Sequence, residues 1–489
     1  MMKTLYVLAA LRSVSALVPA PDPVSVSTPV TQQHSEFQCD LPPALDPAAK
    51  DSLPSAKDLF SSQGALEVQI RRHQAVVRVP SVSYDDLGPF DKDNRWKPFY
   101  ELRRVLAETY PFVHRRSKVE RINTFGLVYT VQGTNTQLKP LLLAAHQDVV
   151  PVENSSSWKY PPFSGHWDGE YLWGRGSVDD KGSLTATMSA LETLLSNRHW
   201  RPRRTVIMAF GFDEEIKGVR GAAYIAVHLR KRYGPDGLAM VIDEGGMGIN
   251  RIGQVVYAVP AVLEKSYLDV WFHLEMAGGH SSTPVPHTAI GIMADAVTAL
   301  EAAPFAPELR RDGPLHHYLL CKARYSPDAQ PELTKLLRGG DLAGAARFMA
   351  NDSLSSRYML QTSQAVDVIH GGDKINALPE DTTLGINYRV APQDSVPAVQ
   401  YSVVRRVRDV VAKYGVQVRA FEGDAAYEAY GTLILTAKDV TFPTPVSPSS
   451  GPIWNVLAGT IRHSVRSGNE TVVPAGGIMN GNTDARHYI

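Results

Sequence analysis

Two patterns of apolar and polar residues follow each other along this chain. In the first, short apolar runs at residues 141–145, 206–210 and 238–242 are separated by stretches with the apolar spacing of helices, at residues 184–195 and 222–232. Apolar strands that alternate with helices are typical of a mostly parallel sheet with helices on both faces. The first part of the chain therefore predicts an α/β fold.

The second pattern begins after residue 262, where strand-like segments alternate between apolar and polar residues. Such alternation is typical of strands with one buried face, and the helical segments between them carry one apolar face. In chain order, the segments are residues 267–275, 288–302, 381–390, 396–414 and 416–421. Strands joined by helices on one face indicate an α+β sandwich. We predict that residues 263–442 form an inserted α+β lid domain with a helical insertion at residues 304–362.

The two ends of the chain differ from these patterns. Residues 1–20 combine a basic residue, a short apolar run and small residues, which resembles a secretory signal peptide; the alternative is an ordinary frayed N-terminus. Residues 21–60 begin rich in Pro and Ser and are expected to be a linker or arm. Residues 61–262 and 443–489 are expected to form one discontinuous α/β domain. Because no apolar run approaches the roughly 20 residues that span a bilayer, we expect no transmembrane segment.

Composition narrows the class of protein. The 489 residues include 50 Lys plus Arg and 50 Asp plus Glu, so the formal net charge is zero, and nucleic acid is not an expected partner. An apolar fraction of 44% is too high for a mostly disordered chain. Two cysteines exclude a four-cysteine zinc site and an iron–sulfur protein. Cys39 and Cys321 can pair only if the fold brings them together, and two free thiols are the alternative.

The acidic residues are unevenly placed, because many of them follow the predicted strands or precede a predicted helix. Eight acids share this placement: Asp148, Asp179, Asp180, Asp213, Glu214, Glu215, Asp243 and Glu244. Ligand sites of open α/β sheets lie at the carboxyl ends of strands, so these side chains are expected to converge. Any one of these acids alone is more often a helix cap or a solvated loop residue. As a set, they indicate a site.

Converging carboxylates destabilise a fold unless a cation compensates them. Lys181 and Arg175 cannot balance eight acids, so we predict bound divalent metal. Imidazole and carboxylate ligands without thiolate suit Zn²⁺, with Mn²⁺ or Co²⁺ as substitutes. One ion would not need so many acids, so we predict two ions that hold a water and a scissile carbonyl together. Asp148 shares a strand face with His146 and can orient its imidazole.

Four ordered motifs stand out: His146-Gln147-Asp148-Val149-Val150-Pro151, Gly174-Arg175-Gly176 with Asp179-Asp180-Lys181-Gly182, Asp213-Glu214-Glu215, and Asp243. Together they resemble the aminoacylase/carboxypeptidase family of two-zinc exopeptidases, most closely its carboxypeptidase S and N-acyl-amino-acid hydrolase members. The resemblance implies that His146 and Asp243 bind one zinc ion, and that Glu215 and His487 bind the other. Asp179 would bridge the two ions, and Glu214 would be the general base. A cis peptide bond between Asp179 and Asp180 is also implied.

The same resemblance assigns residues of the predicted lid. His280, within Gly278-Gly279-His280-Ser281-Ser282, would polarise the scissile carbonyl, and Asn376 would contact substrate. Arg389 would bind the free carboxylate of the substrate bidentately, as a guanidinium group can. Without the resemblance, His280 is equally well a loop histidine and Arg389 an exposed strand arginine. Many relatives dimerise through the lid, so a homodimer is expected.

The expected function is hydrolysis of the amide bond next to a free C-terminal amino acid, in Gly-Xaa dipeptides or N-acyl amino acids. The chain ends two residues after His487, where relatives usually continue, so a weakened or non-catalytic peptide-binding relic is one alternative. An N-acyl-amino-acid synthase/hydrolase is another. The signal-like N-terminus and the sequons at Asn154, Asn351 and Asn469 fit a secreted or vacuolar glycoprotein.

Overall fold

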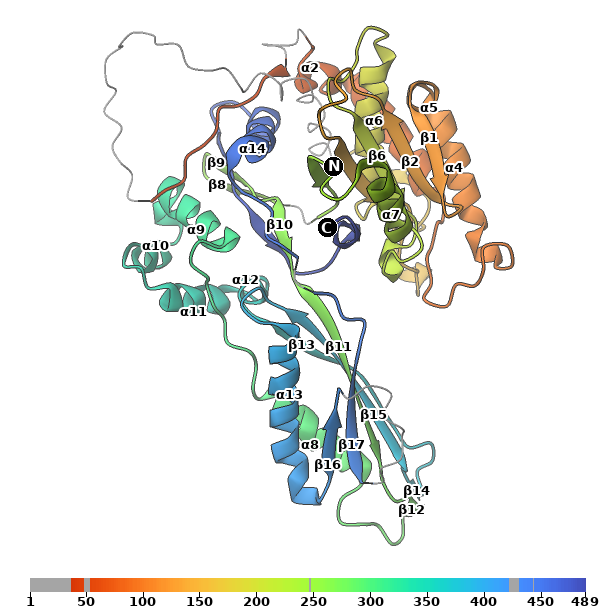
Figure 1. Ribbon diagram of the computed structural model, residues 1–489, viewed down its shortest axis with the longest axis vertical. Coiled ribbons are helices and arrows are strands. Elements are labelled where there is room, and N and C mark those ends of the chain that lie inside the picture. The colour runs from red at the N-terminus through yellow and green to blue at the C-terminus, as the bar shows by residue number, and fades with distance from the viewer. Residues whose placement is uncertain (1–36, 48–52, 246–247, 422–430, 443) are drawn as a thin grey trace.

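The protein is described by a computed structural model that covers residues 37–47, 53–245, 248–421, 431–442 and 444–489. Two five-stranded sheets, each with helices packed against it, lie at opposite ends of an elongated molecule (Figure 1). The predicted signal segment, residues 1–20, lies outside the described residues. Within the described ranges, none of the helices combines the length and the apolar character needed to cross a membrane.

The first sheet has the strand order β1-β2-β6-β3-β7. Its strands are β1 (Lys118–Ile122), β2 (Gly126–Val131), β3 (Leu141–His146), β6 (Val206–Gly211) and β7 (Met240–Ile242). The predicted parallel pairing holds for β6, β3 and β7, whereas β1 and β2 run antiparallel. The reason is a short turn between β1 and β2, in which Asn123 and Thr124 have positive φ angles of 44° and 73°. Such a turn returns the chain alongside itself as a hairpin.

Helices cover both faces of this sheet, as predicted. The helices are α3 (Gln63–Val77), α4 (Lys97–Thr109), α5 (Pro111–Arg116), α6 (Lys181–Ser196) and α7 (Ala222–Tyr233). Alternate residues of each strand point to opposite faces. Leu143 therefore packs in the core shared with α6, while Leu142 packs with Ile225 and Leu229 of α7. Burial on both faces explains why β3 and β6 read as continuous apolar runs.

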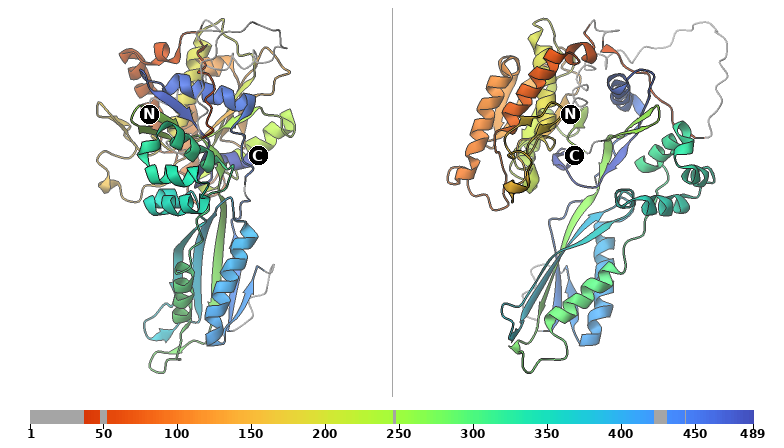
Figure 2. Two further views of the ribbon diagram at one scale, coloured as in Figure 1. Left: turned by 90° about the vertical axis from the view of Figure 1, so that its left-hand side faces the viewer. Right: turned by 180° about the vertical axis from the view of Figure 1, so that it is seen from behind.

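The second sheet has the order β13-β15-β11-β17-β16 and forms the core of the predicted lid. Its strands are β11 (Ser266–Glu275), β13 (Ser363–Gly371), β15 (Asp381–Val390), β16 (Gln417–Ala420) and β17 (Thr432–Lys438). One face packs on α8 (Ala289–Glu301) and α13 (Val396–Val411), and both helices run along the sheet in the two views of Figure 2. Buried and half-buried residues alternate along β11, as the sequence pattern predicts. The sequence did not predict β13 or β17.

A third unit lies between the two large sheets. It contains a small sheet of β8 (Ile249–Ile252), β9 (Val255–Ala258) and β18 (Thr471–Pro474), a parallel pair of β10 (Ala261–Glu264) and β19 (Gly477–Met479), and α14 (Gly451–Val465). The helical insertion forms α9 (Pro314–Tyr325), α10 (Pro331–Arg338), α11 (Leu342–Asp352) and α12 (Leu354–Tyr358). These helices pack together around Leu319, with Phe37 and Ile478, rather than in the core of the second sheet.

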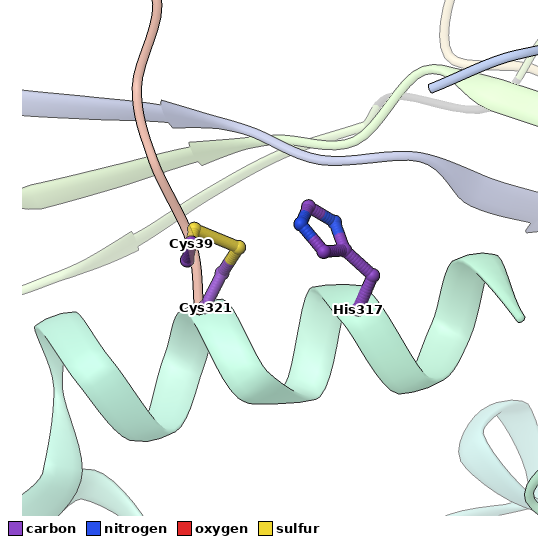
Figure 3. Close-up of side chains that lie close together, drawn as sticks. All are labelled: Cys39, His317 and Cys321. Atoms are coloured by element: carbon purple, nitrogen blue, oxygen red, sulfur yellow. A yellow bond between two sulfur atoms is a disulfide. The ribbon is translucent and has the colours of Figure 1, made fainter. Parts of the chain in front are cut away.

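Part of the segment expected to be a linker is anchored instead. Cys39 forms a disulfide with Cys321 of α9, across 282 positions of sequence (Figure 3). Both half-cystines are buried, in a cluster that includes Tyr257 and Val473. Further along the arm, the Leu45 backbone N–H donates a hydrogen bond of 3.0 Å to the Gly459 carbonyl. The disulfide therefore joins the N-terminal arm to the helical insertion.

Removing this disulfide is expected to destabilise the protein. The cross-link closes a long loop and thereby reduces the conformational entropy of the unfolded chain. We expect Cys39→Ser with Cys321→Ser to lose about 2–4 kcal/mol of unfolding free energy. Denaturant unfolding of the double variant and the wild type, each with and without a thiol reductant, measures this. Equal stability of the double variant and the oxidised wild type would contradict the expectation.

Candidate active site

His146 is the last residue of β3, at the carboxyl edge of the first sheet. It is only 1% exposed, and its ring lies among carboxylates. Its Nε2 lies 2.9 Å from Asp179 Oδ1 and 3.5 Å from Glu244 Oε2. Burial lowers the pKa of His146, but hydrogen bonds to Asp148, Asp179 and Glu244 outweigh burial and raise the pKa well above its usual value. The imidazole thus sits at the centre of the predicted acidic cluster.

Asp148 is fully buried and connects this imidazole to a neighbouring turn. Its Oδ1 lies 3.3 Å from His146 Nδ1, and the Ser83 hydroxyl donates to its Oδ2 at 2.7 Å. The backbone N–H groups of Glu214 and Glu215 each donate to the same carboxylate at 3.1 Å. Burial raises the pKa of Asp148, but the hydrogen bond to His146 and these donors lower it below its usual value. The ionised carboxylate therefore fixes both the ring and the turn.

The turn held by Asp148 is the 3₁₀ helix η5 (Glu214–Ile216), which follows β6. Asp213 accepts the N–H groups of Arg220 and Gly221 at 2.8 Å, so it shapes the loop. Burial, reinforced by the nearby Glu244 and Asp148 charges and opposed by His146, raises the pKa of Glu214 to about 8. Burial likewise raises the pKa of Glu215 to about 7. These two carboxyls gain a proton easily unless a cation approaches.

Asp243 and Glu244 follow β7, the strand beside β3. Asp243 is half-buried, and desolvation of its carboxylate with the Glu244 charge raises its pKa to about 7. Its Oδ1 accepts the Glu244 N–H at 2.9 Å, whereas its buried Oδ2 has no hydrogen-bond partner among the residues that the structure describes. An unpartnered buried carboxylate oxygen is costly unless a cation binds it. Asp243 therefore offers a free ligand atom next to the cluster.

Asp179 and Asp180 precede α6 and reach the cluster from the other side. The peptide bond between them is cis, as the resemblance implied. The Asp179 side chain is 65% exposed, and its pKa is lowered by the hydrogen bond to His146. Asp180 is buried, and its Oδ2 accepts the His146 backbone N–H at 3.2 Å. Burial raises the pKa of Asp180 well above its usual value.

These residues fit a divalent metal. Within this cluster, two groups of residues could hold an ion, with ligand atoms within 4.8 Å of one another: His146 with Asp179 and Glu215, and His146 with Asp180 and Glu244. The raised carboxyl pKa values and the unpartnered Asp243 Oδ2 both indicate negative charge that the described residues do not balance. Of the predicted ligands, the structure thus brings His146, Asp179 and Glu215 together, with Asp243 beside them. Glu244, which was predicted only as one of the eight converging acids, joins them.

His487 is placed differently from the other predicted ligands. It ends the 3₁₀ helix η8 (Asp484–His487), and its Nε2 lies 3.0 Å from the Lys217 carbonyl oxygen. Burial lowers the pKa of His487, so the ring is neutral. The metal-capable groups of the described residues do not include it.

Asp484 is a residue of this site that the sequence reasoning missed. It is 2% exposed, and within the described part of the chain both of its carboxylate oxygens lack a hydrogen-bond partner. Burial and the Asp243 and Glu214 charges raise its pKa well above the usual value. A Cβ atom at Gly211 would lie 2.3 Å from Asp484 Oδ2, so glycine leaves the room that this carboxylate occupies. Its one sequence signal is its place in Thr483-Asp484-Ala485-Arg486-His487, which follows no predicted strand.

The predicted lid residues fall into two places. Arg389 of β15 stacks over Tyr267, with its Cζ 4.4 Å from the ring centroid, and lies 3.5 Å from Asn482 Oδ1 through Nη1. It therefore touches the segment that carries Asp484. His280 and Asn376 lie together at the opposite tip, at the small antiparallel pair of β12 (Gly279–His280) and β14 (Ala377–Leu378), far from β6 (Figure 1). Within this chain, the structure does not bring His280 and Asn376 to the acidic cluster.

Metal-stripped protein is expected to lose stability as the pH rises from about 5 to about 7. Asp213, Glu214, Glu215 and Asp243 have folded-state pKa values raised to between about 6 and about 8, so the folded state binds more protons than the unfolded state across this range. Their contribution is present below the unfolded carboxyl pKa and is lost as the pH rises through the raised values. Thermal midpoints of chelator-treated protein across this range check the sign. Zinc should restore stability at pH 7, and a chelated protein as stable at pH 7 as at pH 5 would contradict the assignment.

The chain matches the profile of Peptidase family M20/M25/M40 over residues 142–489. It is 40% identical to an uncharacterized carboxypeptidase of Schizosaccharomyces pombe over 92% of this chain and 76% of that protein. It is 38% identical to carboxypeptidase S of Saccharomyces cerevisiae over 92% of this chain and 80% of that protein. It is also 31% identical to an N-fatty-acyl-amino acid synthase/hydrolase of Mus musculus, over 85% and 77% of the two chains.

Among solved structures, the fold is similar to an M20 family metallo-carboxypeptidase from Sulfolobus solfataricus. The TM-score is 0.56 at 17% identity, and the match covers 86% of this chain and 88% of that one. At this identity, the match concerns the fold. It agrees with the predicted combination of an α/β unit and an inserted α+β unit.

Proposed function

The chain belongs to Peptidase family M20/M25/M40, and on this premise we propose that it is a two-zinc exopeptidase acting next to a free C-terminal amino acid. Membership of this family, which includes carboxypeptidases, makes the protein a metal-dependent hydrolase of the carboxypeptidase and dipeptidase kind. The observation that supports the two-zinc proposal is the group of His146, Asp179 and Glu215, next to the largely buried side chain of Glu214.

In the proposed metal site, His146 and Asp243 would hold one zinc ion and Glu215 the other, and the Asp179 carboxylate would serve both. The thiol-free donor set suits Zn²⁺, and Mn²⁺ or Co²⁺ are substitutes. His487 completes the second set only if it exchanges its hydrogen bond with the Lys217 carbonyl for a metal bond. When bound, such a pair of ions supplies Lewis acidity that activates water and polarises a carbonyl.

Glu214 is the proposed general base. Its backbone is fixed by Asp148, and its side chain is largely buried, so it is held in one place. A general base works best with a pKa near the operating pH, and nearby divalent cations bring a pKa of about 8 down towards that range. Glu214 takes a proton from the attacking water and later delivers it to the leaving amine.

The lid residues are proposed to bind the rest of the substrate. Arg389 lies beside the C-terminal segment and offers its guanidinium group to the substrate carboxylate. His280 and Asn376, at the far tip, are proposed to act in the site of a second copy in a homodimer. Residues 61–262 with 443–489, and 263–442, remain the proposed domain division.

The proposed substrates are Gly-Xaa dipeptides or N-acyl amino acids. The similarity to an N-fatty-acyl-amino acid synthase/hydrolase keeps reversible N-acyl chemistry as a second candidate. The test measures leucine released by the purified full chain from glycyl-leucine, N-acetyl-leucine and N-oleoyl-leucine, with zinc or with a chelator. Zinc-dependent release from at least one of them supports the proposal. Inactivity on all three, or activity that survives the chelator, refutes it.

We also propose a secreted or vacuolar location for the protein. Disulfides form and persist in oxidising compartments, and Cys39 and Cys321 are paired. The sequon residues Asn154, Asn351 and Asn469 are all exposed, as glycosylation requires. A mass shift after deglycosylation of the protein from its native host tests this proposal.

A further inference from the structure

A cavity of about 340 Å³ adjoins the acidic cluster. Glu215 forms part of its wall, and so does Ser83, whose hydroxyl donates to Asp148 Oδ2 at 2.7 Å. An occupant of this cavity therefore touches the same turn that carries the proposed metal ligand and the proposed general base. The cavity is at the small end of the roughly 300–1,000 Å³ range of ligand pockets.

The charges around the cavity differ in how they are compensated. Asp86 lines the cavity, but its Oδ1 lies 2.7 Å from Arg95 Nη1, so its charge is paired. Arg95 also pairs with Asp93 at 2.7 Å and stacks over Tyr84. Asp85 lines the cavity too, is exposed, and forms no ion pair within the described part of the chain.

The rest of the cavity wall is mostly apolar. Tyr84, Val150 and Ile216 contribute to it. Such a wall accepts a hydrogen atom or a small side chain on the residue that carries the charge. A long alkyl chain in the same place would lie against the Asp85 carboxylate and would desolvate it without a compensating hydrogen bond.

We propose that this cavity binds the free ammonium group of a dipeptide's first residue, with Asp85 as its counter-charge. This inference rests on the proposed exopeptidase function and names the substrate class of the same site. In a dipeptide, one Cα atom separates the ammonium group from the scissile carbonyl, and Asp85 and Glu215 line the same cavity, so an ammonium group in this cavity lies next to a carbonyl held at the neighbouring cluster. The chain accordingly prefers dipeptides with a free amine to N-acyl amino acids.

The test compares glycyl-leucine with N-acetyl-leucine, which lacks the ammonium group. Both are assayed with the wild type, with Asp85→Asn, and with the control Asp91→Asn, an exposed aspartate that does not line the cavity. Loss of a hydrogen bond between charged groups is expected to lower kcat/KM for glycyl-leucine roughly tenfold to a hundredfold in Asp85→Asn. The value for N-acetyl-leucine should stay within about twofold, and Asp91→Asn should match the wild type.

The outcomes separate this inference from the proposed function. If the wild type hydrolyses neither compound, nor N-oleoyl-leucine, the exopeptidase assignment fails. If the wild type hydrolyses glycyl-leucine but Asp85→Asn lowers kcat/KM equally for both substrates, or for neither, the proposed ammonium site is wrong and the exopeptidase assignment stands. A wild type that prefers N-acetyl-leucine also overturns the ammonium site.

Discussion

Glu214→Gln is expected to lower kcat by about 10²–10⁴ while the zinc content stays at the wild-type level. Glutamine has nearly the same shape, so the hydrogen bond from the Glu214 backbone N–H to Asp148 remains. The amide cannot accept a proton from water, and the proton transfer that a buried carboxyl with a pKa of about 8 can perform is lost. Steady-state kinetics with glycyl-leucine, together with elemental analysis, separate this loss from a loss of metal.

A matched control for this variant is Glu153→Gln, an exposed glutamate outside the cluster, which should behave as the wild type. Equal activity of Glu214→Gln and wild type would remove Glu214 from the chemistry. A fall in zinc content parallel to the fall in kcat would instead make Glu214 a metal ligand.

Asp179→Ala is expected to remove most of the bound metal as well as the activity. The Asp179 carboxylate lies 2.9 Å from His146 Nε2 and belongs to the group that also contains Glu215. Replacing a residue that serves both ions should weaken the binding of both ions. We therefore expect the metal affinity to fall by at least about 100-fold and the activity to fall with it. Isothermal titration calorimetry with zinc measures the metal affinity.

Because Asp179 is 65% exposed, its replacement should leave the fold intact, which the thermal midpoint in chelator can check. Asp91→Ala is the corresponding control at an exposed position. Full zinc occupancy in Asp179→Ala would show that the cluster holds metal without a bridging carboxylate.

The parts of the site that lie on apolar strands were predictable from sequence. His146 ends β3 and Asp243 follows β7, and because these strands are neighbours in one sheet, the rule that sites lie at carboxyl ends of strands places the two residues together. Glu214 and Glu215 follow β6 in the same way. Asp484 follows no such strand, and only tertiary packing through Gly211 places it beneath the cluster.

Other features depend on contacts between distant parts of the chain. The pairing of Cys39 with Cys321 spans 282 positions and leaves no local pattern. Strand β13 is an edge strand with many exposed residues, so the alternation of apolar and polar residues that identifies a strand in the sequence is weak there. The positions of His280 and Asn376 follow from the length of the second sheet, which carries its tip away from the cluster (Figure 1).

The zinc content of the purified full-length chain tests the central claim most directly. The acidic cluster around His146 predicts about two zinc ions per chain. A chelator should remove the zinc and abolish glycyl-leucine hydrolysis, and added zinc should restore both. A chain that holds no zinc and keeps its hydrolytic activity in chelator would contradict the two-metal site.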